Sequence, residues 1–208
     1  MIIKNIIFDL GGVLLNIDYQ LTVMAFKDLG IENFEELYSQ AKQTDLFDKI
    51  ETGKIESNLF LRKIEKIAAK KISLTDIEKA WNALLLDLPT ERISMLQKAS
   101  QNYRIFLLSN TNEIHYNQYI NDIRRIHEVD FNKLFEQAYY SHQIGLKKPD
   151  RKCFQYVLNK NLLKPEETLF VDDTIQHIES AKQIGIQTHY LYKNNITELF
   201  DDKGYLIS

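Results

Sequence analysis

Acidic, hydroxyl and lysine side chains follow short apolar runs at four points of this sequence. Asp9 and the pair Asp172-Asp173 each come directly after an apolar run, Ser109 ends another, and Lys148 follows a weaker one after a short loop. A carboxylate at the end of a buried strand is costly unless a charged group meets it. These residue types therefore predict one site at which acids, a hydroxyl and a cation act together.

Three converging carboxylates would repel one another and raise one another's pKa values unless a cation joined them. Mg²⁺ suits this role, because it takes oxygen ligands and is often held by one or two carboxylates together with substrate phosphate. Ser109 and Lys148 would then bind phosphate oxygens. Asp9 would act as a metal-positioned nucleophile in covalent catalysis.

Two glycines, Gly11 and Gly12, follow Asp9 almost at once. Glycine lets the backbone turn sharply and brings main-chain amides and carbonyls close to a ligand. In open parallel sheets, ligands bind at the carboxyl ends of the strands. We therefore expect both glycines to line the substrate site. Taken alone, the stretch could also be a solvated aspartate that begins a β-turn.

Alternating strands and helices are expected to position these residues. Buried strands are predicted at residues 6–8, 104–108 and 168–171, a weaker strand at 137–141 and a fifth strand at 187–192. Strands that alternate with helices imply crossover connections and a parallel sheet. The expected fold class is therefore α/β, a Rossmann-like parallel sheet flanked by helices.

Residues 17–87 lack strand signals and are helical in pattern throughout. Thr75-Asp76-Ile77-Glu78 has the Thr-x-x-Glu form of a capping box, which marks the start of a helix. We expect a helical cap over residues 17–87, of the four-helix-bundle type, inserted into a catalytic core formed by residues 1–16 and 88–208.

Composition limits the possible partners and compartment. The 208 residues are 44% hydrophobic and 26% charged with a formal charge of −3, which provides no basic surface for nucleic acid. Cys153 is the only cysteine, so an intrachain disulfide or thiolate metal cluster is excluded. No apolar run approaches the ~20 residues of a membrane span, and residues 1–5 lack signal-peptide features. We expect a cytoplasmic protein that contacts neither nucleic acid nor membrane.

Taken together, these motifs resemble those of the haloacid dehalogenase superfamily of hydrolases, most of whose members are Mg²⁺-dependent phosphatases. The four motifs occur in the family's order: Phe8-Asp9-Leu10-Gly11-Gly12-Val13, Ser109-Asn110-Thr111, Lys148-Pro149 and Val171-Asp172-Asp173. The match covers essentially the whole chain, including a helical C1 cap between the first and second motifs. It implies a sheet with the first-motif strand at its centre.

The resemblance also implies a role for each motif residue. The roles fall into three sets: Asp9 and Lys148 for catalysis; Ser109, Asn110, Gly11, Gly12 and Lys148 for substrate binding; and Asp9, Gly11, Asp173 and Asp172 for magnesium. Asp9 would form an aspartyl-phosphate. The expected partner is a small phosphorylated metabolite, bound by a monomer or weak homodimer.

One position departs from the family's pattern. Its phosphatases usually carry a second aspartate, the general acid and base, where this chain has Gly11. Such acid–base help is typically worth about 10²–10⁴-fold. Three outcomes are open. The natural leaving group departs without a strong acid, as that of an anomeric sugar phosphate or acyl phosphate would; Asp18, a cap residue or water substitutes for the missing acid; or catalysis is poor. The α-D-glucose-1-phosphate phosphatases, a branch that this sequence resembles, also have Asp-Leu-Gly, which favours the first outcome.

Gly11 keeps two alternative functions open. The superfamily's 2-haloacid dehalogenases also lack the second aspartate and need no metal, although Asp172-Asp173 fits a metal site better. A catalytically weak phosphoester-binding or phosphoacceptor protein is the other alternative. The five histidines show no ligand spacing, and only His142, near the Lys148 loop, is expected to approach a substrate.

Overall fold

The computed structural model describes residues 2–31, 45–67 and 71–207. A five-stranded parallel sheet in the order β3-β2-β1-β4-β5 forms its centre. The strands are β1 (Asn5–Phe8), β2 (Arg104–Ser109), β3 (Gln137–Tyr140), β4 (Thr168–Asp172) and β5 (Gln187–Tyr190). The predicted α/β fold is therefore confirmed, and β1 is the central strand as expected.

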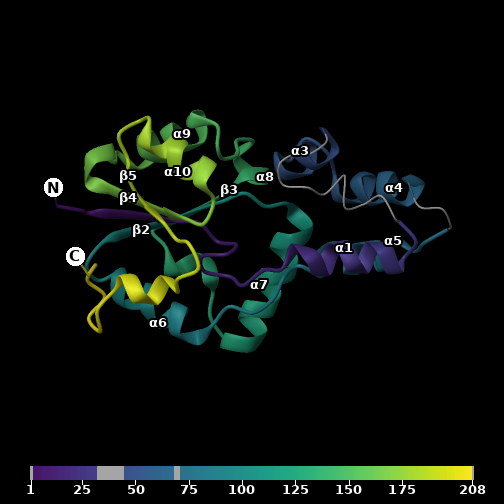
Figure 1. Cartoon of the computed structure of the whole chain (residues 1–208), viewed down its shortest axis with the longest axis horizontal. Coiled ribbons are helices and arrows are strands. Elements are labelled where there is room, and N and C mark those ends of the chain that lie inside the picture. The colour runs from purple at the N-terminus through teal and green to yellow at the C-terminus, as the bar shows by residue number, and fades with distance from the viewer. Residues whose placement is uncertain (1, 32–44, 68–70, 208) are drawn as a thin grey trace.

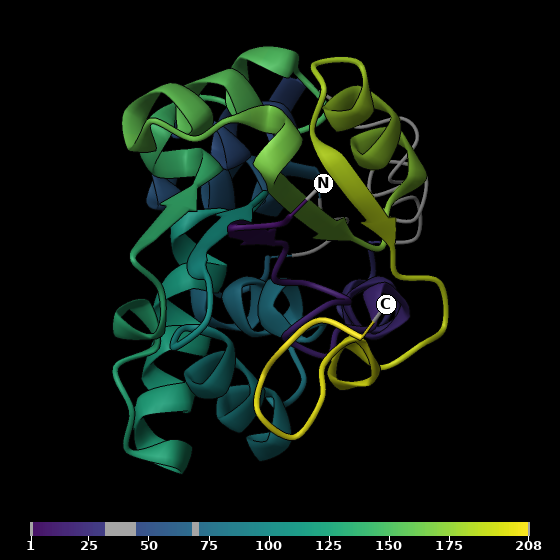
Figure 2. The same ribbon diagram turned by 90° about the vertical axis from the view of Figure 1, so that its left-hand side faces the viewer.

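Helices cover both faces of the sheet. The helices that follow the insertion are α6 (Thr90–Ala99), α7 (Glu113–His127), α8 (Ser141–Ile144), α9 (Arg151–Asn161) and α10 (Ile175–Lys182), with short 3₁₀ turns η1 (Phe131–Leu134), η2 (Pro165–Glu167) and η3 (Ile196–Leu199). Figures 1 and 2 show α6 and α7 on one face of the sheet and α9 and α10 on the other.

The apolar run in β1 reflects this double cover. Ile6 and Phe8 belong to the buried cluster that includes α6 and α7, whereas Ile7 belongs to the cluster formed with α9 and α10. Successive side chains of a strand point to opposite faces, so a strand covered on both sides is apolar at every position. The apolar run therefore ends at Phe8, because the chain reaches the polar edge of the sheet at Asp9.

A helical insertion lies between β1 and β2. Its described helices are α1 (Tyr19–Asp28), α3 (Asp45–Glu51), α4 (Ser57–Ile67) and α5 (Leu74–Asn82). They pack around Trp81, which stacks on Phe47 at a ring distance of 5.4 Å and lies 4.8 Å from the ring of Phe60. In Figure 1 the insertion extends to the right of the sheet. The proposed boundaries at residues 17 and 87 stay a prediction.

The start of α5 differs from the prediction. Ser73, not Thr75, is the N-cap, and its hydroxyl accepts a hydrogen bond from the main-chain N–H of Asp76. Ser73 also donates to the Asp76 carboxylate at 2.6 Å. The capping motif is therefore Ser-x-x-Asp, two residues before the predicted Thr-x-x-Glu.

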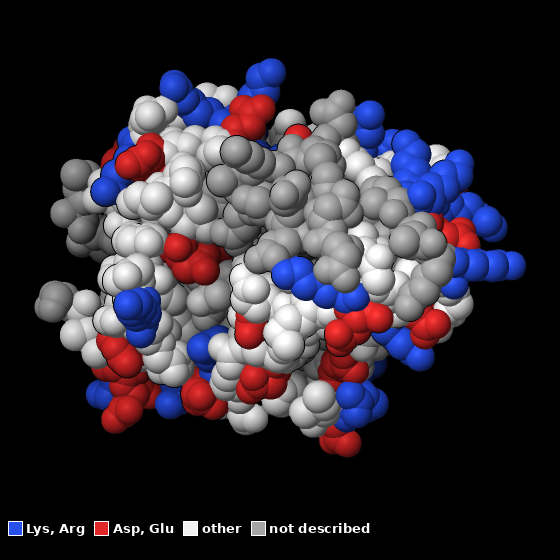
Figure 3. Space-filling model, turned by 45° about the vertical axis from the view of Figure 1, so that its right-hand side comes forward, with Lys and Arg blue, Asp and Glu red and all other residues white. Residues whose placement is uncertain are grey.

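None of the helices within the described residues has the length and apolar character needed to cross a membrane. On the face shown in Figure 3, basic side chains gather toward the right and acidic ones along the lower side.

The expected compartment, and the expected absence of a nucleic-acid partner, stay predictions.

Candidate active site

The polar residues predicted to act together do meet at one edge of the sheet. Asp9 follows β1, while Ser109 and Asp172 end β2 and β4, the two strands that pair with β1. The carboxyl ends of these parallel strands share an edge, so side chains separated by 163 positions become neighbours. Asp9, Ser109 and Asp172 are buried, at 7%, 2% and 0% exposure.

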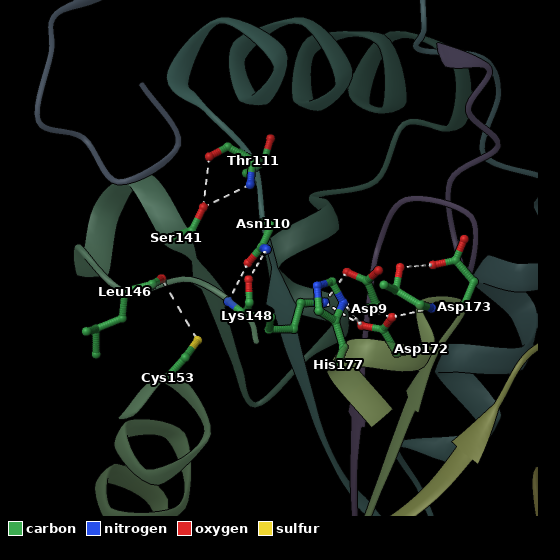
Figure 4. A network of polar contacts seen from close by, with 11 residues as sticks. Asp9, Asn110, Thr111, Ser141, Leu146, Lys148, Cys153, Asp172, Asp173 and His177 are labelled. Carbon is green, nitrogen blue, oxygen red and sulfur yellow. Dashed lines mark hydrogen bonds and ion pairs between the residues drawn. The ribbon is translucent and has the colours of Figure 1, made fainter. Parts of the chain in front are cut away.

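Lys148 joins two of the carboxylates. Its Nζ atom lies 2.7 Å from Oδ1 of Asp9 and 2.7 Å from Oδ2 of Asp172 (Figure 4). Burial alone would lower the pKa of Lys148, but Asp172 and Asp9 outweigh this effect and raise it. Lys148 therefore remains a fully buried cation within the acid cluster.

Asn110 holds the backbone of the lysine loop. Its side-chain amide donates to the carbonyl of Lys148 at 2.8 Å, and its side-chain oxygen accepts from the N–H of Lys148 at 2.9 Å. These two hydrogen bonds tie the end of β2 to the lysine loop. Asn110 thus fixes the position of the Lys148 backbone, and its contact with substrate stays a prediction.

Asp9, Asp172 and Asp173 offer carboxylate oxygens that all lie within 4.8 Å of one another. Burial, followed by repulsion from Asp9 and Asp172, raises the pKa of Asp173 to about 7. Such a carboxylate is stabilised in its charged form by a further cation. The donor set therefore fits a hard divalent ion such as Mg²⁺.

The three acids are not equivalent. Asp172 already binds Lys148, accepts from the N–H of Thr174 at 2.8 Å and lies 3.0 Å from Nδ1 of His177. Lys148 and His177 lower the pKa of Asp172 although its burial acts in the opposite direction. Asp173 accepts from the hydroxyl of Thr174 at 3.3 Å but, within the described residues, forms no ion pair with Lys148 or His177, so it is the better placed of the pair to ligate a metal.

Gly12 provides space for Asp173. A Cβ atom built on Gly12 would lie 2.1 Å from Oδ2 of Asp173, and the φ angle of Gly12 is +78°. Both the contact and the backbone conformation require glycine at this position. Gly12 therefore has a structural role that the sequence did not predict: the absence of a side chain leaves room for the Asp173 carboxylate.

A family model for haloacid dehalogenase-like hydrolases matches residues 3–185. The chain belongs to this family. A D-ribitol-5-phosphate phosphatase of Bacteroides thetaiotaomicron is 28% identical over 186 residues, which cover 89% of this chain and 90% of the relative. A sesquiterpene phosphatase of Aspergillus oryzae is 27% identical over 192 residues, covering 88% of this chain and 87% of the relative.

A solved structure extends the similarity to three dimensions. It is an aspartate-to-alanine mutant of a haloacid dehalogenase family enzyme from Bacteroides thetaiotaomicron, in complex with magnesium and inorganic phosphate. The two chains superpose with a TM-score of 0.91 at 31% identity, over 96% of this chain and 100% of that one. The predicted haloacid dehalogenase-like enzyme is thus confirmed, and the predicted cofactor is the metal bound in that relative.

In this haloacid dehalogenase-like hydrolase, an isoleucine occupies the space beside Gly11. A Cβ atom at Gly11 would lie 3.0 Å from Cδ1 of Ile17. Asp18, considered as a substitute acid, is exposed and accepts from the N–H of Gln20 at 2.9 Å, which makes it the N-cap of α1. Asp18 therefore has a structural explanation, and it does not line the cavity beside Gly11.

A cavity of about 90 Å³ begins beside Gly11 and Ser109 and extends under the insertion. Among the described residues, the walls that the insertion contributes are mainly apolar, with the Glu51 carboxylate and the Tyr19 hydroxyl as polar groups. The cavity-lining residues include Ile17, Phe47, Glu51, Trp81 and His115. The site is therefore shared between the sheet edge and the insertion.

His115 connects these two parts. Its Nε2 atom donates to the main-chain carbonyl of Trp81 at 2.9 Å, and Nδ1 accepts from the side chain of Asn112 at 3.0 Å. Since one ring nitrogen donates and the other accepts, the ring is neutral. Burial is the main cause that lowers the pKa of His115, to about 4.

Sequence reasoning missed two of the histidines. His177 pairs with Asp172, and its position one helical turn after Asp173 was a usable signal. His115 gave no such signal, because its partner Trp81 lies 34 residues away. His142, expected near the substrate, instead packs its ring against Tyr116 and Tyr140 and does not line the cavity.

Proposed function

We propose that this chain is an Mg²⁺-dependent phosphatase that hydrolyses a small phosphate monoester through an aspartyl-phosphate on Asp9. The observation that carries the proposal is the convergence of Asp9, Asp173 and Lys148 at the sheet edge. When bound, Mg²⁺ would supply positive charge to phosphoryl oxygens and to the carboxylates. Asp9 and Asp173 would hold it, with the Gly11 carbonyl and, less directly, Asp172.

Each remaining residue has a defined task. A carboxylate oxygen of Asp9 attacks phosphorus, the bond from phosphorus to the leaving oxygen breaks, and water later cleaves the acyl phosphate. Lys148 and the Ser109 hydroxyl bind the phosphoryl oxygens. Asn110 keeps Lys148 in place through its two main-chain hydrogen bonds.

The leaving oxygen receives no proton from position 11, because Gly11 has no side chain and Ile17 occupies the adjoining space. Water, or a group on the insertion, must then supply the proton. Substrates with good leaving groups should consequently react fastest. Anomeric sugar phosphates such as α-D-glucose 1-phosphate, suggested by the resemblance in the first motif, meet this condition.

A polyol or sugar phosphate of about five carbons is the preferred substrate class, and a polyol 5-phosphate, whose leaving group is a primary alcohol, would depend on water or a group of the insertion for its proton. The ribitol-5-phosphate phosphatase similarity spans nearly both chains, and the cavity is small. Metal-free dehalogenation is less favoured, because Asp173 with its raised pKa gains charge stabilisation from a cation.

A phosphate-release screen tests this function. It should contain polyol 5-phosphates, aldose 1-phosphates, nucleotides, acyl phosphates and 2-chloro acids, each with Mg²⁺ and with a chelator. Repeated turnover of a phosphate ester that stops on chelation and returns with Mg²⁺ is the expected result. Halide release unaffected by chelation would contradict it, as would a single equivalent of phosphate without turnover.

A further inference from the structure

Ser141, the first residue of α8, binds both main-chain groups of Thr111. Its hydroxyl oxygen accepts a hydrogen bond from the Thr111 N–H at 2.9 Å, and the hydroxyl donates to the Thr111 carbonyl at 2.9 Å (Figure 4). Ser141 is 1% exposed, so water does not compete for either bond. One buried hydroxyl therefore holds the last residue of the Ser109-Asn110-Thr111 motif.

The structure of α8 itself does not account for this serine. A serine at the start of a helix often uses its hydroxyl to cap the first turn. In α8 the N-cap is Tyr140, and the helix has four residues. The Ser141 hydroxyl is directed instead at the segment that follows β2. Its role therefore lies in that segment.

The end of the strand ladder shows what Ser141 adds. β2 and β3 pair in parallel as far as Ser109 and Tyr140. Buried main-chain N–H and carbonyl groups beyond a ladder still require partners. Ser141 follows Tyr140 directly, and its hydroxyl supplies both partners for Thr111. A side chain therefore continues the connection between the two strands past their last main-chain pair.

Each residue of the Ser109-Asn110-Thr111 motif is consequently held by a different neighbour. Ser109 pairs with β3, the Asn110 side chain binds the main chain of Lys148, and Thr111 is held by Ser141. All three motif residues line the cavity. The directions of the Ser109 hydroxyl and of the main-chain N–H groups of the motif depend on this conformation.

The position of Ser141 is fixed from the side of the insertion. A Cβ atom at Gly53 would lie 2.2 Å from the main-chain carbonyl oxygen of His142, and the φ angle of Gly53 is +66°. Further along the same segment, Nζ of Lys147 lies 2.9 Å from Oε2 of Glu51 in α3. The segment that carries Ser141 is therefore anchored independently of the motif that it holds.

We propose that Ser141 is a positioning residue, which orients the Ser109-Asn110-Thr111 motif for phosphate binding. The inference rests on the proposed phosphatase function, in which the Ser109 hydroxyl binds a phosphoryl oxygen. Ser141 acts through Thr111, since its hydroxyl both accepts from and donates to that residue. Without the hydroxyl, the Thr111 main chain loses two buried hydrogen bonds and the motif shifts. A displacement of about 1 Å in a binding group can cost about 10²-fold in rate.

Two variants separate positioning from stability. Ser141→Ala removes the hydroxyl with little change in volume. Thr168→Val is the matched control, because the buried Thr168 hydroxyl donates to the Lys164 carbonyl at 2.8 Å and accepts from Asn5 at 3.2 Å. Thr168 begins β4, at the opposite end of the sheet from the site. Both variants lose one buried hydroxyl with two hydrogen bonds, so both should lower the midpoint of thermal denaturation.

Calorimetric titration with inorganic phosphate in saturating Mg²⁺ measures the proposed role. We expect Ser141→Ala to raise the Kd of phosphate by about 10-fold. We also expect it to lower kcat/KM by about 10- to 100-fold for the ester that the wild type hydrolyses fastest. Thr168→Val should leave both values unchanged, although it loses stability. A merely structural role of Ser141 would lower the denaturation midpoint without moving the phosphate Kd.

An unchanged phosphate Kd in folded Ser141→Ala would overturn the assignment, as would an equal rise in Thr168→Val. Ser141→Cys is the second variant if Ser141→Ala unfolds. A thiol is a weak donor and acceptor, so the Kd should rise by a smaller factor, and an unchanged Kd would again overturn the assignment. The wild type tests the proposed function separately. Absence of phosphate binding in Mg²⁺ would contradict that function, whereas binding unaffected by the Ser141 variants contradicts the role of Ser141 alone.

Discussion

The Nζ atom of Lys148 lies 2.7 Å from Oδ1 of Asp9, inside a cluster that also contains Asp172 and Asp173. One buried cation therefore compensates two strand-end carboxylates, because Lys148 lies equally close to Asp172. Asp173 remains outside this pairing, with its pKa raised to about 7. The residual negative charge lies where a divalent ion would bind.

Replacing the proposed nucleophile should abolish turnover. Asp9→Asn retains the size of the side chain but removes the attacking carboxylate, so we expect steady-state phosphate release to fall by about 10³-fold or more. Asp202→Asn, at an exposed position near the C-terminus, is the matched control. Turnover retained in Asp9→Asn would remove Asp9 from its role.

Gly12→Ala should weaken magnesium binding through Asp173. The added Cβ would lie 2.1 Å from Oδ2 of Asp173, so the carboxylate must move. The Mg²⁺ concentration for half-maximal activity should rise by about 10-fold or more. Gly145→Ala is the control, since Gly145 also has a positive φ of +71° but nothing within 4 Å of an added Cβ.

Both glycine variants should lose roughly 1 kcal/mol of stability from the left-handed backbone. Only Gly12→Ala should alter the dependence of activity on Mg²⁺. Parallel titrations of the two variants measure this difference. Identical magnesium curves would show that Asp173 does not depend on the space left by Gly12.

Restoring an aspartate at position 11 should require a second change. Ile17 would lie 3.0 Å from the new Cβ, so Gly11→Asp alone should not orient a working acid. Combined with Ile17→Ala, it should raise the rate for poor leaving groups by up to about 10²-fold, the lower end of general acid catalysis. The measurement is kcat/KM against leaving-group pKa for a series of phosphate esters. A flat dependence in the wild type would show that another acid already acts.

Mild acid should destabilise the contact between insertion and core through His115. The unfolded chain binds a proton near the ordinary pKa of 6.5, whereas the folded protein keeps the buried ring neutral down to about 4. Stability is therefore fully present above pH 6.5 and is lost as pH falls from 6.5 to about 4. At ~1.4 kcal/mol per pH unit, the loss reaches about 3 kcal/mol.

His115→Gln should flatten this dependence, because glutamine does not titrate. Urea denaturation of the wild type and the variant between pH 4 and pH 7 measures it. His127→Gln, at the other end of α7 where the ring is partly exposed, should retain the wild-type slope. Parallel curves for wild type and His115→Gln would contradict the prediction.

The sequence alone determined the sheet and the edge at which chemistry occurs. Apolar runs such as Ile6-Ile7-Phe8 specify strands covered on both faces, and their alternation with helices specifies parallel order. Once that order is known, Asp9, Ser109 and Asp172 must lie at one edge. Local periodicity and chain connectivity carry this information, because both can be recognised in the sequence without knowledge of any tertiary contact.

Only the tertiary structure decided which side chains meet at that edge and above it. The pairing of Asp172 with His177, the space beside Gly11 taken by Ile17, and the ion pair of Glu51 with Lys147 depend on how elements rotate and pack. Even the start of α5 at Ser73 was displaced from Thr75, because several nearby side chains can cap a helix. A helical pattern specifies which face of a helix is buried. Which residues of distant segments lie opposite that face is decided by tertiary packing.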